Sequence, residues 1–408
     1  MLFAFSCGLD YVERDLLGVS THHSKRVAYI ASQVGGLFGL NGSQKSDLAG
    51  CALLHDNALT EYIQDEADRG NNVLRTGKND VSRHCILGEE HAKSIPFFGN
   101  VGNVILYHHE NADGTGPFGK RAGEIPLYAA LIHLGDQLDS VFHFSTMTDE
   151  KYRRLVDFVR KETGKLFFSE YAEAFLDLFG RQKFSEMTDQ AIDGSITRSF
   201  PMFRTEYSPE QVFAFSSVFA RIIDYKSRFT REHSVGLAAK AAAIADYYHF
   251  DLEKKTAFYL AATLHDIGKL AVDVNILEKP DRLTPAEFSA IQEHAWHSYR
   301  ILRDIDGFRK MNGWASYHHE KLDGSGYPFG LTAVDLGFEE RLMACLDIYQ
   351  ALVEKRPYKD GMPHDKAIAI LDKMAKQGGL DGDIVSDLND KFGGMCAEPT
   401  GAALNGEV

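Results

Sequence analysis

The sequence lacks the long apolar runs that membrane proteins carry, and it has few cysteines. No run of 18 or more apolar residues occurs among the 408 residues, whereas a membrane-spanning helix needs about 20. The five cysteines are odd in number and show no paired spacing, so we expect no disulfide framework. The short apolar start has no basic stretch before it, which argues against a secretory signal. These absences together favour a reduced, cytoplasmic setting without a membrane.

Positive charge is also scarce. Lys and Arg number 44 against 58 Asp and Glu, which gives a net charge of −14. Such an acidic chain is not expected to bind DNA or RNA. An anionic substrate would therefore need metal ions or a few well-placed basic side chains. The length suits two domains, each large enough to bury its own core.

The most informative feature that is present is an internal repeat. The segment that begins at His233 repeats the one that begins at His23, 210 residues earlier, and the offset becomes 211 after Gly114. Five histidines and two aspartates in register are too many for chance. The matching pairs are His23 and His233, His55 and His265, Asp56 and Asp266, His84 and His294, His108 and His318, His109 and His319, and Asp136 and Asp347.

The repeat predicts the domain organisation. We expect a first unit at 1–145, a helical connector at 146–212, a second unit at 213–392 and a disordered Gly- and Ala-rich tail at 393–408. The alanine-rich stretch 236–246 and the weaker 366–372 favour helices. Capping boxes start at Ser208 and Thr284. Since no series of alternating β-branched strands occurs, the expected fold is all-α, with two tandem helical bundles.

The second unit has more histidines than an ordinary core would hold. A lone pair such as His265-Asp266 is usually a hydrogen-bonded structural pair. Here four further histidines and Asp347 accompany it, and burying such groups unpaired costs several kcal/mol. Metal ions satisfy many of them at once, and imidazole and carboxylate ligands without cysteine suit iron, manganese or zinc. We therefore expect a metal centre.

The second unit resembles the HD-GYP phosphodiesterases. Five motifs carry the resemblance over 213–390, in order: the string HDIGK at 265–269, His294, the string HHEKLDGSGYP at 318–328, Asp347, and the string RPYK at 356–359. The resemblance implies an all-α bundle in which a carboxylate-bridged centre of two divalent ions, iron or manganese first, linearises a cyclic dinucleotide. Cyclic di-GMP and 3′,3′-cyclic GMP-AMP are both candidate substrates in bacterial second-messenger signalling.

The resemblance also implies roles for individual residues. One metal is expected at His233, His265, Asp266 and Asp347, with Asp266 bridging to a second metal at His294, His318 and His319. Asp266 and Lys269 are expected to be catalytic, because the lysine lies one helical turn beyond the His-Asp pair and can meet the scissile phosphate. The expected substrate-binding residues are Tyr327, Pro328, Arg356 and Lys359. A third metal, which some members bind, is not expected, because Phe229 stands where they place a carboxylate.

The first unit keeps the ligands but not the catalytic groups. Its candidate metal residues are His23, His55, Asp56, His84, His108, His109 and Asp136. Leu59 stands at the lysine position, the residue missing from this copy is the tyrosine, and Ser145 and Thr148 replace the arginine and lysine. We therefore expect little or no hydrolysis there. The unit is either a scaffold or a regulatory module that binds nucleotide or senses redox state through its metals.

Two other classes of function compete with the leading one. A phosphohydrolase acting on nucleotides or alarmones would use a similar His-Asp centre, although the Gly-Tyr-Pro loop and the histidine pair disfavour it. A non-enzymatic metal or nucleotide sensor would not need Lys269, Tyr327, Arg356 and Lys359. A cyclic-dinucleotide phosphodiesterase, with intramolecular regulation by the first unit as a further option, remains the prediction.

Overall fold

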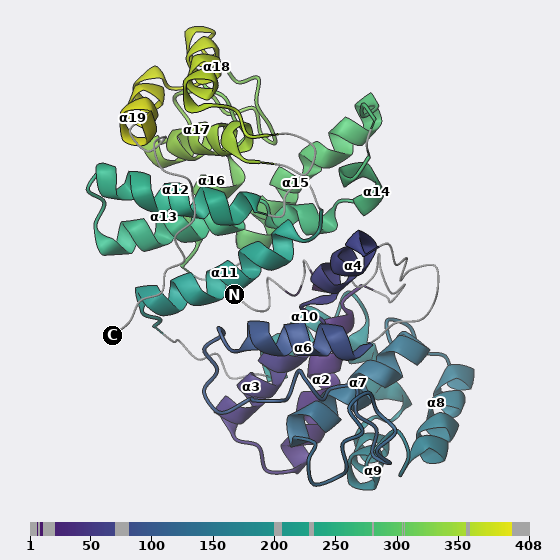
Figure 1. Ribbon diagram of the computed structural model, residues 1–408. Coiled ribbons are helices and arrows are strands. Elements are labelled where there is room, and N and C mark those ends of the chain that lie inside the picture. Colours follow the sequence, from purple (N-terminus) through teal and green to yellow (C-terminus); the bar gives the residue numbers. More distant parts are fainter. Residues whose placement is uncertain are drawn as a thin grey trace, which may run out of the picture. The chain divides into compact units, whose positions relative to one another are not determined.

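Helices account for the regular secondary structure of the computed structural model (Figure 1). The structure describes residues 6, 9–10, 21–69, 81–199, 206–227, 232–279, 281–303, 305, 307–355 and 360–393. Over these ranges the only β-type pairings are two isolated bridges, so the all-α prediction is confirmed. None of the helices described there is long and apolar enough to cross a membrane. The chain divides into unit 1, Met1–Ser227 with Leu270–Leu277, and unit 2, Arg228–Lys269 with Glu278–Val408.

Unit 1 is organised around one almost fully buried helix. Its helices are α2 (His23–Leu37), α3 (Gly42–Leu53), α4 (Leu59–Asp68), α6 (Val81–Ala92), α7 (Leu127–Phe142), α8 (Asp149–Glu162), α9 (Ser169–Leu178), η1 (Arg181–Met187), α10 (Ile192–Ser199), α11 (Pro209–Asp224) and α14 (Val274–Leu277). Helix α2 packs against α3, α7, α9 and α10. It therefore lies at the centre of the apolar core, and its first residue, His23, is buried with it.

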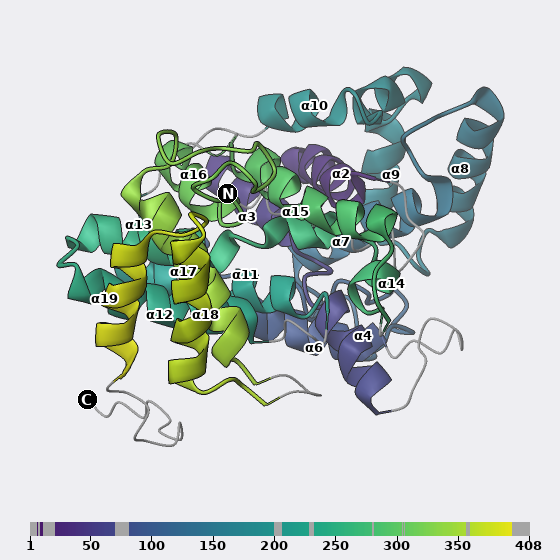
Figure 2. The ribbon, with the colours of Figure 1, turned by 90° about the horizontal axis from the view of Figure 1, so that it is seen from above.

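Unit 2 has its own set of helices. They are α12 (His233–Tyr247), α13 (Leu252–Leu264), α15 (Pro285–Arg303), α16 (Arg309–Ser316), α17 (Phe338–Val353), α18 (His364–Lys376) and α19 (Gly382–Gly393), while the short η2 (Ile267–Ala271) runs across the division between the units. Figure 2 shows α17, α18 and α19 beside one another. The predicted stretches 236–246 and 366–372 lie inside α12 and α18.

The duplication is visible in the way the helices pair. In unit 1, α2 packs on α3, α7 and α9, while α8 packs on α7 and α9. In unit 2, α12 packs on α13, α17 and α19, while α18 packs on α17 and α19. The same pairing pattern therefore occurs twice, and it continues through α8 and α9, beyond the segment in which the sequence motifs match.

The segment expected to be a connector is helical and takes part in the core of unit 1. Phe175, Phe179 and Phe184, from α9 to η1, are almost fully buried and belong to the same apolar cluster as α2. The boundaries at 145, 212 and 392 stay a proposal for the limits of the two repeats. The expected disordered tail lies outside the described residues, except for Gly393, which ends α19.

The helix starts predicted from capping boxes are confirmed. Ser208 caps α11, and its side chain accepts from the Gln211 backbone N–H while the Gln211 side chain accepts in return. At α15 the Thr284 N–H donates to Glu287 over 2.7 Å, and the Glu287 N–H donates to the Thr284 hydroxyl over 3.3 Å. These pairs satisfy backbone donors that the first turn of a helix leaves free. The α15 cap fixes where the helix that carries His294 begins.

Candidate metal centre

The structure brings the seven predicted ligands of unit 2 into one cluster, in which all but the half-buried His319 are buried. His233 begins α12, His265 and Asp266 follow α13, His294 lies on α15, His318 and His319 follow α16, and Asp347 lies on α17. Three overlapping groups have donor atoms within 4.8 Å of one another: His233, His265 and Asp347; His265, Asp266 and His318; His294, His318 and His319. Residues far apart in the sequence thus converge as the register predicted. Their assignment as metal ligands remains a proposal.

Three of these histidines are oriented by the carbonyl three residues earlier. Nδ1 of His265, His294 and His318 lies 2.8, 2.6 and 2.6 Å from the carbonyl oxygens of residues 262, 291 and 315. Because a carbonyl can only accept, each Nδ1 must carry the proton and donate it. In the neutral ring, each Nε2 is then the lone pair, and it is directed at the cluster. Metal-binding histidines are held in this way.

Two buried atoms of the cluster have no hydrogen-bond partner. They are Nε2 of His265 and Oδ1 of Asp266, which form no well-directed hydrogen bond although Asp266 Oδ2 lies 3.0 Å from the first and His294 Nε2 3.3 Å from the second; both residues are at most 2% exposed. Buried polar atoms without partners are costly, and a cation between them would satisfy both. Neighbouring charges outweigh burial and hold the pKa of Asp266 well below its usual range, while burial lowers the pKa of His294 to about 3. An ionised carboxylate beside the neutral imidazole of His294 is the kind of donor pair that a divalent ion requires.

Glu354 is a member of the site that the sequence motifs did not reveal. His233 has Nε2 3.0 Å from Asp347 Oδ1 and Nδ1 2.9 Å from Glu354 Oε2. Glu354 caps the C-terminal end of α17, seven residues after Asp347 and so two turns away on the same face. Burial lowers the pKa of His233, but the two carboxylates outweigh it and raise the pKa to about 10. The i+7 spacing was the only sequence signal for this residue.

Glu320 has a role that its place in the His-His-Glu triplet did not disclose. Its carboxylate accepts from the Phe329 N–H over 2.7 Å and from the Leu331 N–H over 2.9 Å. Gly326 lies so close that an added Cβ would be 2.5 Å from the Glu320 Cα. The buried carboxylate thus folds the Gly-Tyr-Pro loop back against the histidine pair. The Tyr327 ring then lies 4.7 Å from the His319 ring, between centroids.

Lys269 lies at the edge of the cluster. Its Nζ is 2.5 Å from Asp266 Oδ2, and its side chain is 18% exposed, so it can be reached by a ligand. Pro328 is half-buried in the loop. The predicted substrate residues Arg356 and Lys359, and the Phe229 position used to discount a third metal, lie outside the described residues.

The turn after His265-Asp266 is fixed by close backbone packing. The Gly268 N–H donates to the Ser298 hydroxyl over 2.9 Å, and that hydroxyl donates to the His265 carbonyl over 2.7 Å. A Cβ on Gly268 would lie 1.9 Å from the His294 carbonyl oxygen. Glycine is therefore required where the His265 turn meets α15, and the contact sets the distance between two ligand-bearing segments.

Unit 1 repeats this architecture. His55 and His108 have Nδ1 2.8 and 2.6 Å from the carbonyl oxygens of Ala52 and Ile105. Glu110 accepts from the backbone N–H groups of residues 118 and 120, as Glu320 does from 329 and 331. His23, His55 and Asp136 form one donor group. The predicted ligand set is thus assembled here as well.

Asp139 and Cys85 complete the surroundings of the unit 1 site, and neither was expected from the sequence. Asp139 Oδ2 lies 2.7 Å from His23 Nδ1, and Arg26 donates to the other oxygen over 2.8 Å. Cys85 joins His84, His108 and His109 in a second donor group. Burial raises the pKa of this thiol, but the neighbouring histidines outweigh it and lower the pKa to about 7. The position that matches Cys85 in unit 2 is Ala295.

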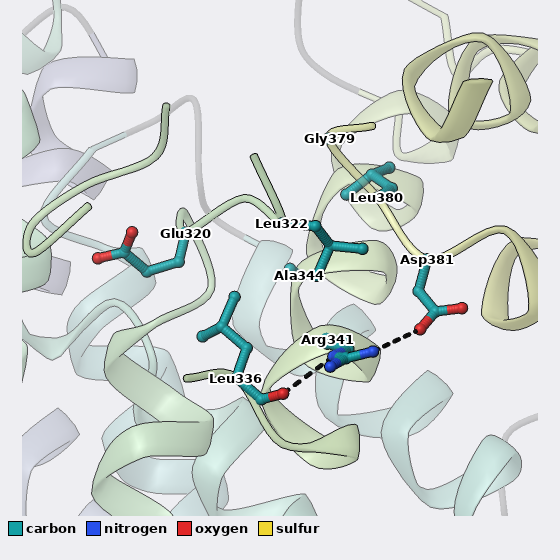
Figure 3. Close-up of a pocket in the computed structure, with 8 residues that line it drawn as sticks. All are labelled: Glu320, Leu322, Leu336, Arg341, Ala344, Gly379, Leu380 and Asp381. Carbon is teal, nitrogen blue, oxygen red and sulfur yellow. Dashed lines mark hydrogen bonds and ion pairs between the residues drawn. The ribbon is translucent and has the colours of Figure 1, made fainter. Parts of the chain in front are cut away.

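A separate small pocket in unit 2 contains none of the candidate ligands (Figure 3). It is lined by Glu320, Leu322, Leu336, Arg341, Ala344, Gly379, Leu380 and Asp381. Arg341 donates to Asp381 over 3.2 Å and to the Leu336 carbonyl over 2.9 Å. These bonds join the loop after Glu320 to the turn before α19. We therefore regard the pocket as part of the loop's support.

An all-α unit with a buried His-Asp centre, present twice, defines the class of HD-type metal-binding bundles. The chain belongs to the HD domain family, whose sequence pattern matches residues 14–154 and 217–384. Both copies are therefore recognised as HD domains, including the one that lacks the lysine and the tyrosine.

Two named proteins and one solved structure are similar to most of this chain. The chain is 27% identical over 385 residues to 3'3'-cGAMP-specific phosphodiesterase 1 of Vibrio cholerae, covering 91% of this chain and 87% of that protein. It is 30% identical over 326 residues to 3'3'-cGAMP-specific phosphodiesterase 3 of the same organism, covering 78% and 69%. A crystal structure of a cyclic GMP-AMP specific phosphodiesterase from V. cholerae superimposes with a TM-score of 0.65 at 22% identity, covering 98% of this chain and 97% of that one. This last similarity establishes the fold.

Proposed function

We propose that unit 2 is a metal-dependent phosphodiesterase that opens a 3′,5′-cyclic dinucleotide to its linear form. The observation that carries the proposal is the buried cluster around His265-Asp266, in which Nε2 of His265 and Oδ1 of Asp266 lack partners. Hydrolysis of a phosphodiester by such a donor set is chemically reasonable, because two divalent ions activate water and stabilise the charge of an in-line displacement at phosphorus. The names of the relatives that match most of the chain agree with this chemistry.

The candidate ligands of unit 2 would bind two metal ions. His233, His265, Asp266 and Asp347 would hold one ion, and His294, His318 and His319 with Asp266 the other. Asp266 suits the bridging role because Oδ1 lies 3.3 Å from His294 Nε2, while Oδ2 lies 3.0 Å from His265 Nε2. Iron and manganese are the ions proposed first, since the donors are imidazole and carboxylate only.

Lys269 and Tyr327 would act on the substrate. The Lys269 ammonium is the positive group nearest the bridging carboxylate among the described residues, and it would stabilise the phosphate charge that grows during displacement. Tyr327 lies beside His319 with its hydroxyl pKa raised by burial, so it stays protonated at neutral pH and would donate a hydrogen bond. Arg356 and Lys359 are proposed to hold the dinucleotide on the basis of the motif alone.

We propose 3′,3′-cyclic GMP-AMP as the preferred substrate. The two relatives that match 91% and 78% of this chain are both named 3'3'-cGAMP-specific. Relatives named as cyclic di-GMP phosphodiesterases match a smaller share, such as 37% and 42% of this chain for those of Xanthomonas campestris and Thermotoga maritima. A third relative so named, 3'3'-cGAMP-specific phosphodiesterase 2 of Vibrio cholerae, matches 35% of this chain, so the proposal rests on the two that match most of it.

The test is a comparison of substrates on the full-length chain. Purified protein would be loaded with Mn²⁺ or Fe²⁺ and given each cyclic dinucleotide, with mononucleotides and an alarmone as controls. We expect a linear dinucleotide, with the highest kcat/KM for 3′,3′-cyclic GMP-AMP. Absence of a linear product from every cyclic dinucleotide would refute the proposed activity, whereas a higher kcat/KM for cyclic di-GMP would refute only the preference.

A further inference from the structure

The two HD sites differ in one donor that the repeat does not predict. In unit 1, Cys85 is fully buried directly after His84 on α6. At the matching place in unit 2, the fully buried Ala295 follows His294 on α15. One position therefore offers a sulfur and the other only a methyl group. Because a thiolate is a much softer ligand than imidazole or carboxylate, this exchange alters which metals a site prefers.

The sulfur lies among nitrogen donors at the spacing that one metal ion would impose. One donor atom from each of His84, Cys85, His108 and His109 lies within 4.8 Å of every other. The Cys85 Sγ is 3.6 Å from His84 Nε2. Ordinary zinc–sulfur and zinc–nitrogen bonds at a tetrahedral angle place these two atoms about 3.6 Å apart. The separation is already that of two ligands on one ion.

Two buried atoms beside this group lack hydrogen-bond partners. They are Asp56 Oδ1 and His108 Nε2, and the two side chains are 5% and 0% exposed. Asp56 Oδ1 lies 3.2 Å from His84 Nε2 and 3.6 Å from His108 Nε2. Nδ1 of His108 donates to the Ile105 carbonyl over 2.6 Å and lies 3.9 Å from the Cys85 Sγ, so in the neutral ring Nε2 is the lone pair, on the side of Asp56. The sulfur and the unpartnered atoms thus surround the same two imidazole rings, those of His84 and His108.

We propose that unit 1 binds a zinc ion through His84, Cys85, His108 and His109, with Asp56 at its edge, as a site distinct in metal preference from unit 2. A set of three imidazoles and one thiolate is complete for a tetrahedral ion and leaves no open position for a substrate water. The site thus retains metal without the groups needed for hydrolysis. Leu59 stands where unit 2 has Lys269 and cannot assist hydrolysis. This difference agrees with a site that only holds a metal.

The experiment uses Co²⁺ as a spectroscopic probe of the full-length, metal-free chain. Only a thiolate ligand gives a sulfur-to-cobalt charge-transfer band in the near ultraviolet, so the sulfur-free site of unit 2 is silent. We expect the band to saturate at the intensity of about one cobalt–thiolate bond per chain once the sites of both units are filled, and to be absent in Cys85→Ala, which reproduces the residue found at 295. Cys51→Ala is the matched control, because Cys51 is also buried in unit 1 but lies outside every donor group found among the described residues.

Zinc content gives a second, independent measurement. After growth with equal zinc and manganese, we expect Cys85→Ala to lose about one equivalent of zinc, with affinity at this site lowered by more than about tenfold. Cys85→Ser keeps the side-chain size and serves as a second variant if the alanine variant folds poorly. It should lose the same band and the same equivalent of zinc. Absence of the band in the unchanged chain, or its persistence in either Cys85 variant, would overturn the proposal. The band does not depend on hydrolysis, so its outcome is separate from that of the proposed function.

Discussion

Lys269 reaches back along η2 to place its Nζ 2.5 Å from Oδ2 of Asp266, the carboxylate whose other oxygen, Oδ1, faces His294. One carboxylate therefore stands between a positive side chain and the imidazole cluster. In unit 1 the matching Asp56 lies beside His84 and His108, and Leu59 occupies the lysine position. This pair is the clearest difference between the proposed catalytic copy and the other one.

Replacing Lys269 with alanine should lower kcat by about 100- to 1,000-fold, because one positioned donor to the transition state is lost. The metal content, measured by elemental analysis, should stay unchanged. Lys255→Ala is the control, since Lys255 pairs with Asp246 elsewhere in unit 2. An unchanged kcat in Lys269→Ala would show that the lysine serves only to balance the charge of Asp266.

Asp266→Ala and Asp56→Ala form a matched pair that separates the two units. Loss of a bridging ligand should reduce hydrolysis by more than about 100-fold, since even the loss of a residue behind a ligand costs 10- to 100-fold. The Asp56 variant should keep most of the activity, because unit 1 lacks the lysine and the tyrosine. The assay is formation of linear dinucleotide. Activity that depends on Asp56 and not on Asp266 would reverse the assignment.

Glu354→Gln should weaken metal binding by about 10- to 100-fold, because a carboxylate behind His233 is replaced by a neutral amide. The measurement is metal affinity by competition with a chelating dye, and excess Mn²⁺ should restore activity. Glu339→Gln removes a charge from the same helix, where it pairs with Lys254, and should leave the affinity unchanged. Equal effects of the two substitutions would point to general electrostatics.

Metal affinity should rise with pH. The pKa of His233 is raised to about 10 by Asp347 and Glu354, so the metal-free site carries a proton there at neutral pH. The stability from this charged pair is complete below the ordinary value of 6.5 and is lost as the pH rises through about 10. A metal must displace the proton, and its apparent affinity should therefore increase about tenfold per pH unit between pH 6 and 9. Calorimetry in buffers with different ionisation enthalpies would count the released protons, and a count of zero would contradict this prediction.

Gly268→Ala should destabilise unit 2 by about 1–3 kcal/mol, because the new Cβ would meet the His294 carbonyl at 1.9 Å and force η2 away from α15. In unit 1 the matching residues are Ala58 and Gly88, so a methyl group there is accompanied by loss of the serine side chain. Adding Ser298→Gly should not restore the stability in thermal unfolding, because the atoms that the Cβ would meet belong to the backbone of His294 and Ser298. Recovery in the double variant would contradict this account of the clash.

Much of the site could be predicted from the sequence because ligands to one centre must recur at fixed positions whenever a fold is duplicated. The offset of 210 and then 211 identified all fourteen candidate ligands, which the structure gathers into donor groups or places beside them. Helix starts at Ser208 and Thr284 were also predictable, since a capping box is a local arrangement of side chain and backbone.

Only the tertiary structure could decide which residues support these ligands. Glu354, Asp139 and Cys85 belong to no motif, and each approaches a histidine that lies on a different segment of the chain. The role of Glu320 likewise depends on the return of a loop to its carboxylate. A repeat in the sequence thus determined where the two HD centres lie and which of them keeps the lysine. Packing decided how each centre is held, because distances between helices are set by contacts that no spacing along the chain records.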